Sequence, residues 1–436
     1  MSFREKLFNT VIRTGTLSVI GTDGSKATYG DGSEPKVTIR LHDPALPRRI
    51  ALNPGLAVGE AYMDGGLTIE DGGDIRQLLD LALRNMGWGI GEHWIMRLGY
   101  RIRIAMRRLG QINPVGKAQA NVAHHYDLSN TLYDLFLDSD RQYSCAYYVS
   151  PDQSIEDAQR QKKRHLAAKL LLEDGQKVLD IGSGWGGLGL HLAQAHRVDV
   201  TGVTLSTEQH GVSQDRASRA GMADRVRFKL QDYRHESGVY DRIVSVGMFE
   251  HVGVYHYHEF FQKLHELLDK DGVALLHTIG RADGPGTTNS WIQKYIFPGG
   301  YTPALSEVMP HIERAGLYVT DIEVLRLHYA ETLLAWYRRF QLNRERIKGL
   351  YDERFCRMWE FYLAGSEMTF RHAGHVVFQI QMAKRQDAVP LTRDYITDYE
   401  RATPLAETVE SPNSTPPELD GAGQPSAGDP QHQAAE

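Results

Sequence analysis

The chain has 436 residues, of which 41% are hydrophobic and 24% charged, and its formal net charge is −6. This balance predicts a globular protein of two or three domains and argues against nucleic acid as a partner, which would favour a basic surface. Two cysteines, Cys145 and Cys356, are too few for a disulfide framework, so we expect a reducing compartment.

Membrane-spanning and secretory segments are not evident. No apolar run approaches the ~20 residues that cross a bilayer. The N-terminal stretch MSFREKLFNTVIRTG lacks the apolar centre of a signal peptide. The sequence therefore predicts a cytoplasmic protein, whose contact with the inner face of the cell membrane would be peripheral.

Residues 1–90 are predicted to form a small α+β domain without a catalytic constellation. Turn-rich stretches such as TDGSKATYGDGSE separate its strand-like segments, and DIRQLLDLALRN has the pattern of a closing helix. The strand-like segments are TLSVIG, KVTIRLHD, RRIALNP and LAVGEAYMDGGLTIEDG.

Residues 91–115 are predicted to form a basic amphipathic helix that links two domains. Its apolar stripe recurs at spacings of three and four, and arginines occupy the other faces. The stripe is Ile95, Leu98, Ile102, Met106 and Leu109, and the arginines are Arg97, Arg101, Arg103, Arg107 and Arg108. Such a helix can lie on an anionic membrane surface, or it can pack between domains with its arginines solvated. Gly99 weakens the helix and favours the second interpretation.

Residues 116–400 alternate between strand-like and helical patterns, which predicts a doubly wound parallel sheet. The five successive strands are KVLDIG, VDVTGVTL, RVRFKLQD, YDRIVSVG and GVALLHTIG. Two later segments, GLYVTDIEVL and GHVVFQIQMAK, are expected at the sheet edge, and the aromatic-rich helical insertion between them, residues 330–365, could cover a ligand. Residues 401–436 are rich in Pro, Gly, Ser and acidic residues and are expected to be a disordered tail.

The turn after the first of these strands, VLDIGSGWGG, is the main cofactor signal. Its D-x-G-x-G-x-G pattern lets a ligand approach the backbone at the carboxyl edge of a sheet, and its spacing differs from the G-x-G-x-x-G of dinucleotide domains. The pattern consists of Asp180, Gly182, Gly184 and Gly186. Polar residues after the second strand could hold a ribose, namely Thr204, Ser206 and Gln209. Together these features favour S-adenosylmethionine over a dinucleotide or a purely structural turn.

Eight segments resemble a single family in its order and spacing, over roughly residues 120–385. They are HYDLSNTLYDLFLDSDRQYSCAYY, VLDIGSGWGGL, GVTLSTEQ, LQDYR, DRIVSVGMFEHVG, LLHTIG, WIQKYIFPGG and TLLAWYRRF. The family is that of the cyclopropane-fatty-acyl-phospholipid synthases. The resemblance implies a Rossmann-like class I methyltransferase domain, preceded by a small lipid-carrier-like domain that residues 1–90 match more loosely. It also implies S-adenosylmethionine as the methyl donor, phospholipid acyl chains at the membrane surface as the substrate, and a homodimer.

By the same resemblance, the chain carries a pocket for a bicarbonate ion that takes up a proton after methyl transfer. Glu250 would orient this ion, which would be held by Cys145, His277, Tyr329 and the backbone of Ile279. Further cofactor-binding positions are implied at Tyr126, Tyr143, Ser144, Leu205, Asp232 and Tyr233. The residues alone agree in part, because Glu250 and His277 follow the fourth and fifth strands and so lie at the carboxyl edge of the sheet.

Several alternatives remain open. Asp232 could merely form a turn, and a metal is not expected, because the adjacent His124 and His125 point in different directions without a third ligand nearby. Ser366 stands in YLAGSEMTF where some family members carry a cysteine, and we expect that cysteine to be dispensable because the implied mechanism needs no thiolate. The competing functions are a C-methyltransferase that makes methyl-branched or methylated-alkene acyl chains, and a non-catalytic lipid-binding protein.

Overall fold

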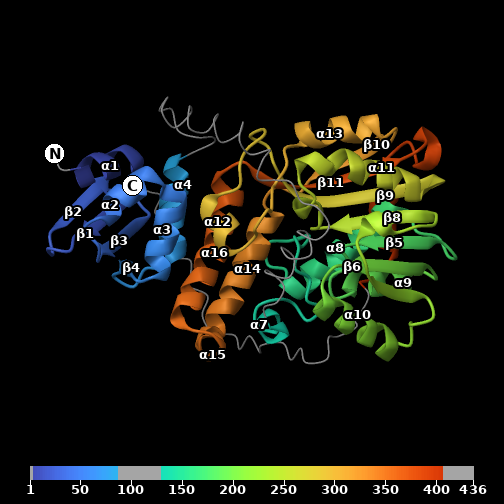
Figure 1. Cartoon of the computed structure of the whole chain (residues 1–436), viewed down its shortest axis with the longest axis horizontal. Coiled ribbons are helices and arrows are strands. Elements are labelled where there is room, and N and C mark those ends of the chain that lie inside the picture. Colours follow the sequence, from blue (N-terminus) through green and yellow to red (C-terminus); the bar gives the residue numbers. More distant parts are fainter. Residues whose placement is uncertain (1–2, 87–128, 406–436) are drawn as a thin grey trace, which may run out of the picture.

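The computed structural model describes residues 3–86 and 129–405, which form a small unit and a larger α/β unit with a group of helices between them (Figure 1). The small unit is blue in Figure 1, and the large sheet lies on the other side of helices α12, α14 and α16. Tyr126, the segment 91–115 and the tail beyond residue 405 lie outside the described residues.

The small unit is an α+β arrangement built on a four-stranded sheet of order β2-β1-β3-β4. β1 is parallel to β3 and antiparallel to β2, and β4 is antiparallel to β3. The strands are β1 (Thr16–Ile20), β2 (Lys26–Gly30), β3 (Lys36–Leu41) and β4 (Leu67–Glu70). The helices are α1 (Phe3–Val11), α2 (Leu46–Leu52), α3 (Pro54–Met63) and α4 (Ile75–Met86).

Two segments of the small unit that were predicted as strands are helices. RRIALNP lies mostly in α2 and LAVGEAYM lies in α3, and each helix has a proline in its first turn, where a missing N–H costs nothing. α3 contacts α2 on one side and α12 and α16 on the other. It buries Ala57, Gly59, Ala61 and Met63, a period of two that imitates a strand. Conversely, KATYG, inside a stretch expected to be all turn, forms β2.

The large unit is built on a seven-stranded sheet of order β10-β11-β9-β8-β5-β6-β7, which confirms the doubly wound prediction. The five strands predicted first are parallel to one another, and β11 is antiparallel to both of its neighbours. β11 therefore lies inside the sheet, so its predicted place at the edge was wrong; of the two late strands, β10 alone is at an edge. The strands are β5 (Lys177–Ile181), β6 (Asp199–Thr204), β7 (Val226–Leu230), β8 (Tyr240–Val246), β9 (Leu268–Arg281), β10 (Tyr318–Val324) and β11 (His375–Ala383).

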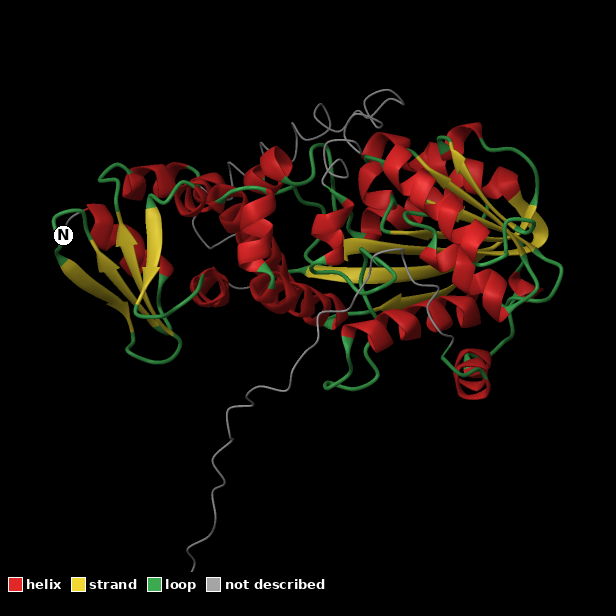
Figure 2. Cartoon of the chain, turned by 90° about the horizontal axis from the view of Figure 1, so that it is seen from below, coloured by secondary structure: helices red, strands yellow, loops and turns green. Residues whose placement is uncertain are grey.

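Helices cover both faces of the large sheet (Figure 2), as a mostly parallel sheet requires. One apolar core joins the sheet to α8, α9 and α10, and a second joins it to α11 and α13. The helices are α7 (Asn130–Asp134), α8 (Ile155–Leu170), α9 (Gly187–Ala195), α10 (Thr207–Arg219), α11 (Tyr257–Leu267), α12 (Ser290–Tyr295), α13 (Leu305–Arg314) and α17 (Asp394–Ala402). Short 3-10 turns are η1 (Tyr233–His235), η2 (Phe249–His251), η3 (Val254–His256) and η4 (Gln386–Ala388).

The predicted helical insertion is confirmed as α14 (His328–Leu342), α15 (Arg344–Leu350) and α16 (Glu353–His372). α16 packs against α14 and also against α3 and α4 of the small unit. Across this second contact, Arg76 donates hydrogen bonds of 2.7 and 2.8 Å to the two oxygens of the fully buried Glu367 carboxylate. The hydroxyl of Tyr62 donates to Glu360 at 2.9 Å. The insertion thus links the small unit to the large one.

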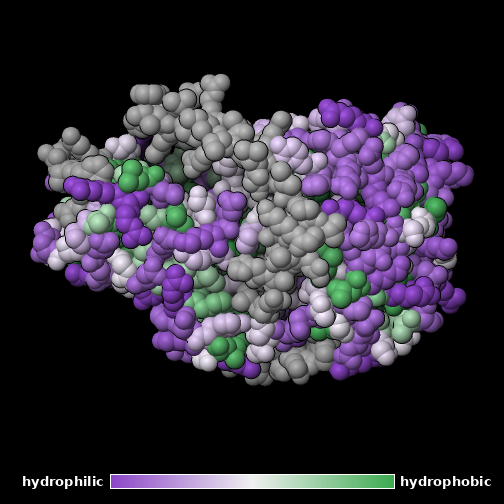
Figure 3. Space-filling model, in the orientation of Figure 1, coloured by the Kyte–Doolittle hydropathy of each residue, from purple (hydrophilic) through white to green (hydrophobic). Residues whose placement is uncertain are grey.

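The described part of the face in Figure 3 is mainly hydrophilic over the large unit, and apolar residues show as small separate patches. Within residues 3–86 and 129–405, every helix is too short or too polar to cross a bilayer.

Candidate active site

A cavity of about 160 Å³ lies at the carboxyl ends of β5, β6 and β8, where the strand order of the sheet reverses. Open α/β sheets bind ligands at this position. Most of the predicted cofactor residues line the cavity: Tyr143, Ser144, Asp180, Gly182, Gly184, Thr204, Leu205, Gln209, Asp232 and Tyr233. Gly186 and Ser206 are not among the lining residues.

The glycines of the turn have different roles. Gly184 has φ +53°, and a methyl group placed on it would meet no protein atom within 4 Å, so the turn leaves open space at this point. Gly186 has φ +83° and caps α9, and a methyl group there would lie 2.7 Å from the ring of Phe228. Gly184 therefore keeps the cavity clear, whereas Gly186 lets α9 pack closely on β7.

Asp180 is a buried acid with an unused acceptor. It is the second-last residue of β5 and lines the cavity, and its Oδ2 has no hydrogen-bond partner among the described residues. Burial raises the pKa of this carboxyl to about 7, against an opposing effect of the Lys162 ammonium. A ligand that donates a hydrogen bond or carries a positive charge would satisfy Oδ2.

The residues after β6 and β7 are held by local hydrogen bonds. Thr204 Oγ1 donates to Gln209 Oε1 at 3.1 Å, and the Ser206 hydroxyl caps α10 by accepting from the Gln209 N–H at 3.3 Å. Ser206 thus shapes the turn from outside the cavity. Asp232 caps η1 and pairs with Arg234 at 2.7 Å, which lowers the pKa of its carboxyl despite burial. It combines the turn-forming role with a place in the cavity wall.

Lys162 of α8 is the main lining residue that the sequence did not reveal. Its ammonium is fully buried and donates to Gln142 Oε1 at 2.7 Å and to Ser144 Oγ at 2.8 Å. Burial lowers its pKa to about 8, although Asp138 and Asp140 counteract the shift. The run RQKKRH had the composition of an exposed helix face. The acidic stretch DSD, which ends two residues before YSCAYY, was the available signal that these lysines have buried partners.

Glu250 lies in η2, beside the cavity. Its Oε1 accepts a 2.6 Å hydrogen bond from the Ile279 N–H, and its Oε2 is buried without a partner among the described residues. Burial raises the pKa of the Glu250 carboxyl to about 7. The Ile279 N–H is therefore already engaged and holds Glu250 itself.

Cys145 is a buried, neutral thiol. Burial raises its pKa above its usual value, and its Sγ donates weakly to the Ala146 carbonyl at 3.3 Å. The Ala146 N–H is bound by Thr332 Oγ1 at 3.0 Å, one turn after Tyr329 in α14. Cys145, Ile279 and Tyr329 belong to one apolar cluster. A thiol in this environment is a poor nucleophile.

His277 lies within β9, so the prediction that it follows this strand was wrong; its neighbour in β8 is Val246 of the cavity wall. Burial lowers its pKa well below the usual value, so the ring is neutral. Glu250, Cys145, His277 and Tyr329 are not among the residues that line the 160 Å³ cavity. Cys145 and His277 adjoin it through Ser144 and Val246, and Glu250 directly precedes His251, all three of these neighbours being lining residues.

Aromatic rings of α14 and α16 enclose this second region. The ring of Tyr143 lies 5.2 Å from that of Trp336, and its hydroxyl is 2.8 Å from that of Tyr362. The ring of Tyr329 lies 4.9 Å from Phe370 and 5.8 Å from Trp336, the latter in an edge-on contact. In residues 3–86 and 129–405, no three His, Cys, Asp or Glu side chains are grouped as metal ligands; His124 and His125 lie outside these ranges.

Known proteins with similar sequences indicate the family of this chain. The model of the mycolic acid cyclopropane synthetase family matches residues 115–380, and a domain of unknown function matches residues 3–89. The cyclopropane-fatty-acyl-phospholipid synthase of Escherichia coli K12 is 36% identical over 354 residues, 81% of this chain and 89% of that protein. A probable fatty acid methyltransferase of Pseudomonas putida is 35% identical over 362 residues, 81% of this chain and 88% of its own.

Solved structures agree with these relatives. The cyclopropane synthase MmaA2 from Mycobacterium tuberculosis matches with a TM-score of 0.59 and 32% identity, over 63% of this chain and 99% of its own. The mycolic acid cyclopropane synthase CmaA1, solved in complex with SAH and CTAB, matches with a TM-score of 0.58 and 33% identity, over 62% and 99% of the two chains. This protein therefore belongs to the mycolic acid cyclopropane synthetase family of S-adenosylmethionine-dependent enzymes.

Proposed function

We propose that the enzyme converts the cis double bond of unsaturated phospholipid acyl chains into a cyclopropane ring, with bicarbonate as the proton acceptor. One observation carries this proposal: a buried Glu250 with an unpartnered oxygen and a neutral His277 lie next to the glycine-turn cavity, behind aromatic walls. Such a pocket can exclude water while it handles a proton.

The residues of the cavity fit S-adenosylmethionine, which supplies the methyl group when bound. Asp180 offers an unused acceptor, Gly184 leaves space along the backbone, and Thr204 and Gln209 place polar atoms at the end of β6. Ser144, positioned by Lys162, adds a hydroxyl to the same wall.

The aromatic region fits the acyl chain. An alkene is a weak nucleophile, so closeness and orientation are the main means of acceleration. The π electrons of the alkene would form the new bond to the methyl carbon as the sulfur–methyl bond of the donor breaks and its electrons stay on sulfur, which leaves a cation on the neighbouring alkene carbon. That cation can be stabilised by the faces of Tyr143, Tyr329 and Trp336. Loss of a proton from the added methyl group then closes the ring.

Bicarbonate, when bound, supplies the base for that proton. Glu250 Oε2 and the free ring nitrogen of His277 are the polar atoms best suited to hold it, together with Tyr329 and Cys145 as the resemblance implies. Because the Ile279 N–H is given to Glu250 at 2.6 Å, the backbone of Ile279 would contribute through its carbonyl.

A C-methyltransferase is the second candidate, because the Pseudomonas putida relative is named a probable fatty acid methyltransferase. The test is incubation of the purified enzyme with monounsaturated phospholipid vesicles, S-adenosylmethionine and bicarbonate. A product heavier by one CH₂ group that co-elutes with a cyclopropane standard supports ring formation. A product of that mass that elutes elsewhere supports the methyltransferase, and bound cofactor without product supports a lipid-binding role.

Variants connect this assay to the site. Glu250→Gln is expected to bind S-adenosylmethionine normally and to form no ring, whereas Glu313→Gln, an exposed change in α13, is expected to retain activity. If the folded Glu250→Gln protein fails to bind the cofactor, the role assigned to Glu250 is wrong.

We also propose that the basic segment 91–115 brings the enzyme to the anionic inner face of the membrane, and that the enzyme forms a homodimer. Replacing Arg101, Arg107 and Arg108 together by glutamate is expected to weaken sedimentation with anionic vesicles. Unchanged sedimentation contradicts the membrane proposal, and a monomeric mass in light scattering contradicts the dimer.

A further inference from the structure

Among the described residues, the His277 side chain has one hydrogen-bond partner, which lies on the neighbouring strand. Gln379 of β11 and His277 of β9 are directly opposite in the antiparallel pair. The Gln379 side chain is 0% exposed, and its Nε2 lies 3.2 Å from Nδ1 of His277. Gln379 Oε1 has no partner among the described residues, so its contact with the imidazole is the only hydrogen bond that this amide makes there.

The chemistry of this contact decides where the imidazole proton lies. In this structure the amide nitrogen of Gln379 faces the ring, and because an NH₂ group can only donate, this orientation makes Nδ1 of His277 the acceptor. A neutral imidazole carries one proton, which is then on Nε2. Nε2 of His277 forms no hydrogen bond with any residue in the described ranges, so this N–H is available to a ligand.

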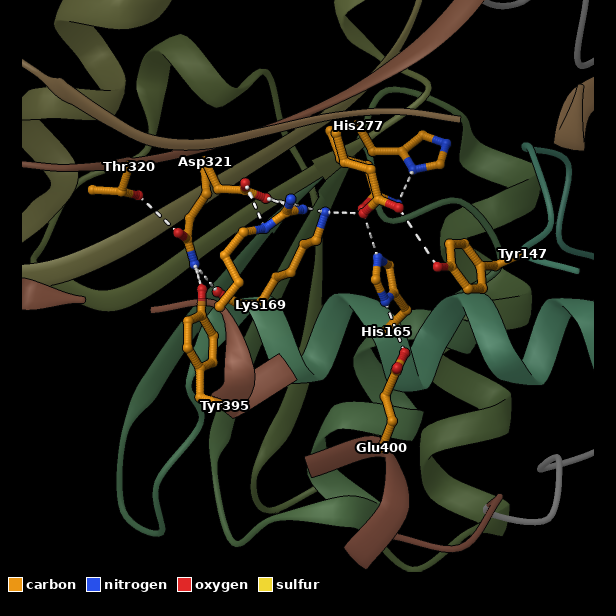
Figure 4. A network of polar contacts seen from close by, with 12 residues as sticks. Tyr147, His165, Lys169, His277, Thr320, Asp321, Tyr395 and Glu400 are labelled. Carbon is orange, nitrogen blue, oxygen red and sulfur yellow. Dashed lines mark hydrogen bonds and ion pairs between the residues drawn. The ribbon is translucent and has the colours of Figure 1, made fainter. Parts of the chain in front are cut away.

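The surroundings keep the ring neutral. Burial is the main cause of the lowered pKa of His277, and the nearby Lys162, Lys169 and His165 act in the same direction, while Glu323 opposes them. Figure 4 shows His277 beside the polar network that contains His165, Lys169 and Tyr147. In that network, His165 Nε2 and the hydroxyl of Tyr147 both contact Glu323, at 2.8 and 3.5 Å.

We propose that Gln379 is a positioning residue that holds His277 in the tautomer with the proton on Nε2, so that the ring donates a hydrogen bond to the bound anion. This inference rests on the proposed function in one respect, that the anion binds beside His277. The opposite tautomer would turn a lone pair toward the anion and repel it.

The test is ¹⁵N NMR of histidine-labelled enzyme without lipid or bicarbonate, since protonated and bare ring nitrogens of a neutral imidazole have well-separated shifts. A His277→Gln sample identifies the signals of His277. We expect a bare Nδ1 and a protonated Nε2 in the unmodified enzyme. A protonated Nδ1 there would overturn the inference, whatever the variants do.

Gln379→Glu supplies the functional test. The new carboxylate can only accept a hydrogen bond, which requires a proton on Nδ1, so the ring either changes tautomer or becomes cationic beside a developing carbocation. A wrong tautomer lowers the kcat of a serine protease by about 10⁴-fold, and we expect a loss of at least ~10²-fold in kcat here, with little change in the KM for S-adenosylmethionine. Unchanged kcat in a folded variant whose Nδ1 is protonated would overturn the proposal.

Gln381→Met is the matched control, because Gln381 lies two residues along β11, is equally buried and hydrogen-bonds to Lys169 O and Tyr395 instead of His277. It is expected to leave the His277 tautomer and kcat unchanged. A changed tautomer or a lower kcat in Gln381→Met would mean that the effect of Gln379→Glu comes from strand packing, and would overturn the inference. Titration with bicarbonate separates this inference from the proposed function. A protonated Nε2 that does not respond to bicarbonate refutes the anion site and leaves the tautomer assignment standing.

Discussion

Replacing Glu250 by glutamine is expected to stabilise the protein in a pH-dependent way. Burial raises the pKa of the Glu250 carboxyl from 4.5 to about 7. A folded-state pKa above the unfolded-state value means that the fold prefers the protonated acid. Stability is then complete below pH 4.5 and falls as the pH rises toward 7. At about 1.4 kcal/mol for each pKa unit, ionisation costs the folded state about 3 kcal/mol above pH 7.

Glutamine removes this cost and retains the acceptor for the Ile279 N–H. We therefore expect Glu250→Gln to exceed the unmodified protein in free energy of unfolding by about 1 kcal/mol at pH 5 and about 3 kcal/mol at pH 8. Urea unfolding followed by tryptophan fluorescence measures both differences, without cofactor. Glu313→Gln, an exposed change, is expected to show the same small difference at both values. Equal stability of Glu250→Gln and the unmodified protein at pH 8 would refute the reasoning, because it would mean that the ionised carboxylate is not penalised by burial.

Three further changes test the glycine turn and the acid beside it. Gly184→Ala is expected to fold, since its methyl group meets no protein atom within 4 Å, but to weaken S-adenosylmethionine binding by about tenfold or more; calorimetry that finds unchanged affinity would place the ligand elsewhere. Gly186→Ala puts a methyl group 2.7 Å from Phe228 and is expected to cost about 1–3 kcal/mol, seen as a lower Tm; an unaltered Tm would contradict the close packing of α9. Asp180 has its pKa raised to about 7 by burial, so the affinity for S-adenosylmethionine should rise with pH through that value, and Asp180→Asn should abolish this dependence in calorimetric titrations at several pH values.

The large unit was predictable because its strands are short apolar runs between helices, a pattern with few other solutions. The order of strands was less accessible, since β11 pairs between β9 and β10 through contacts that sequence position does not reveal. In the small unit, α3 is covered on two sides, and its resulting burial period of two hides the helical period. A helix cannot be predicted from its hydrophobic pattern where more than one of its faces is buried.

The site residues found from the sequence are those that stand at strand ends or match the family's segments. Lys162 and Gln379 were missed for a common physical reason. A lysine in a charged helix and a glutamine in a strand are usually solvated, and only the fold shows that both are fully buried behind reacting groups. The polar neighbours of Glu250 and His277 depend on pairing between distant strands, and this pairing cannot be predicted from a single sequence.

The contact of α16 with the small unit bears on how the enzyme can be shortened. MmaA2 matches 99% of its own length within 63% of this chain, so a related catalytic fold exists at a smaller size. In this chain, removal of residues 3–86 would uncover the flank of α16, where Arg76 binds the carboxylate of Glu367, and Trp291 of α12, which lies against Gly59. A version shortened by truncation alone would expose apolar and charged surface on α16, the helix that also lines the aromatic pocket. A smaller version of this enzyme therefore also requires replacement of the newly exposed residues of α16 by residues suited to solvent.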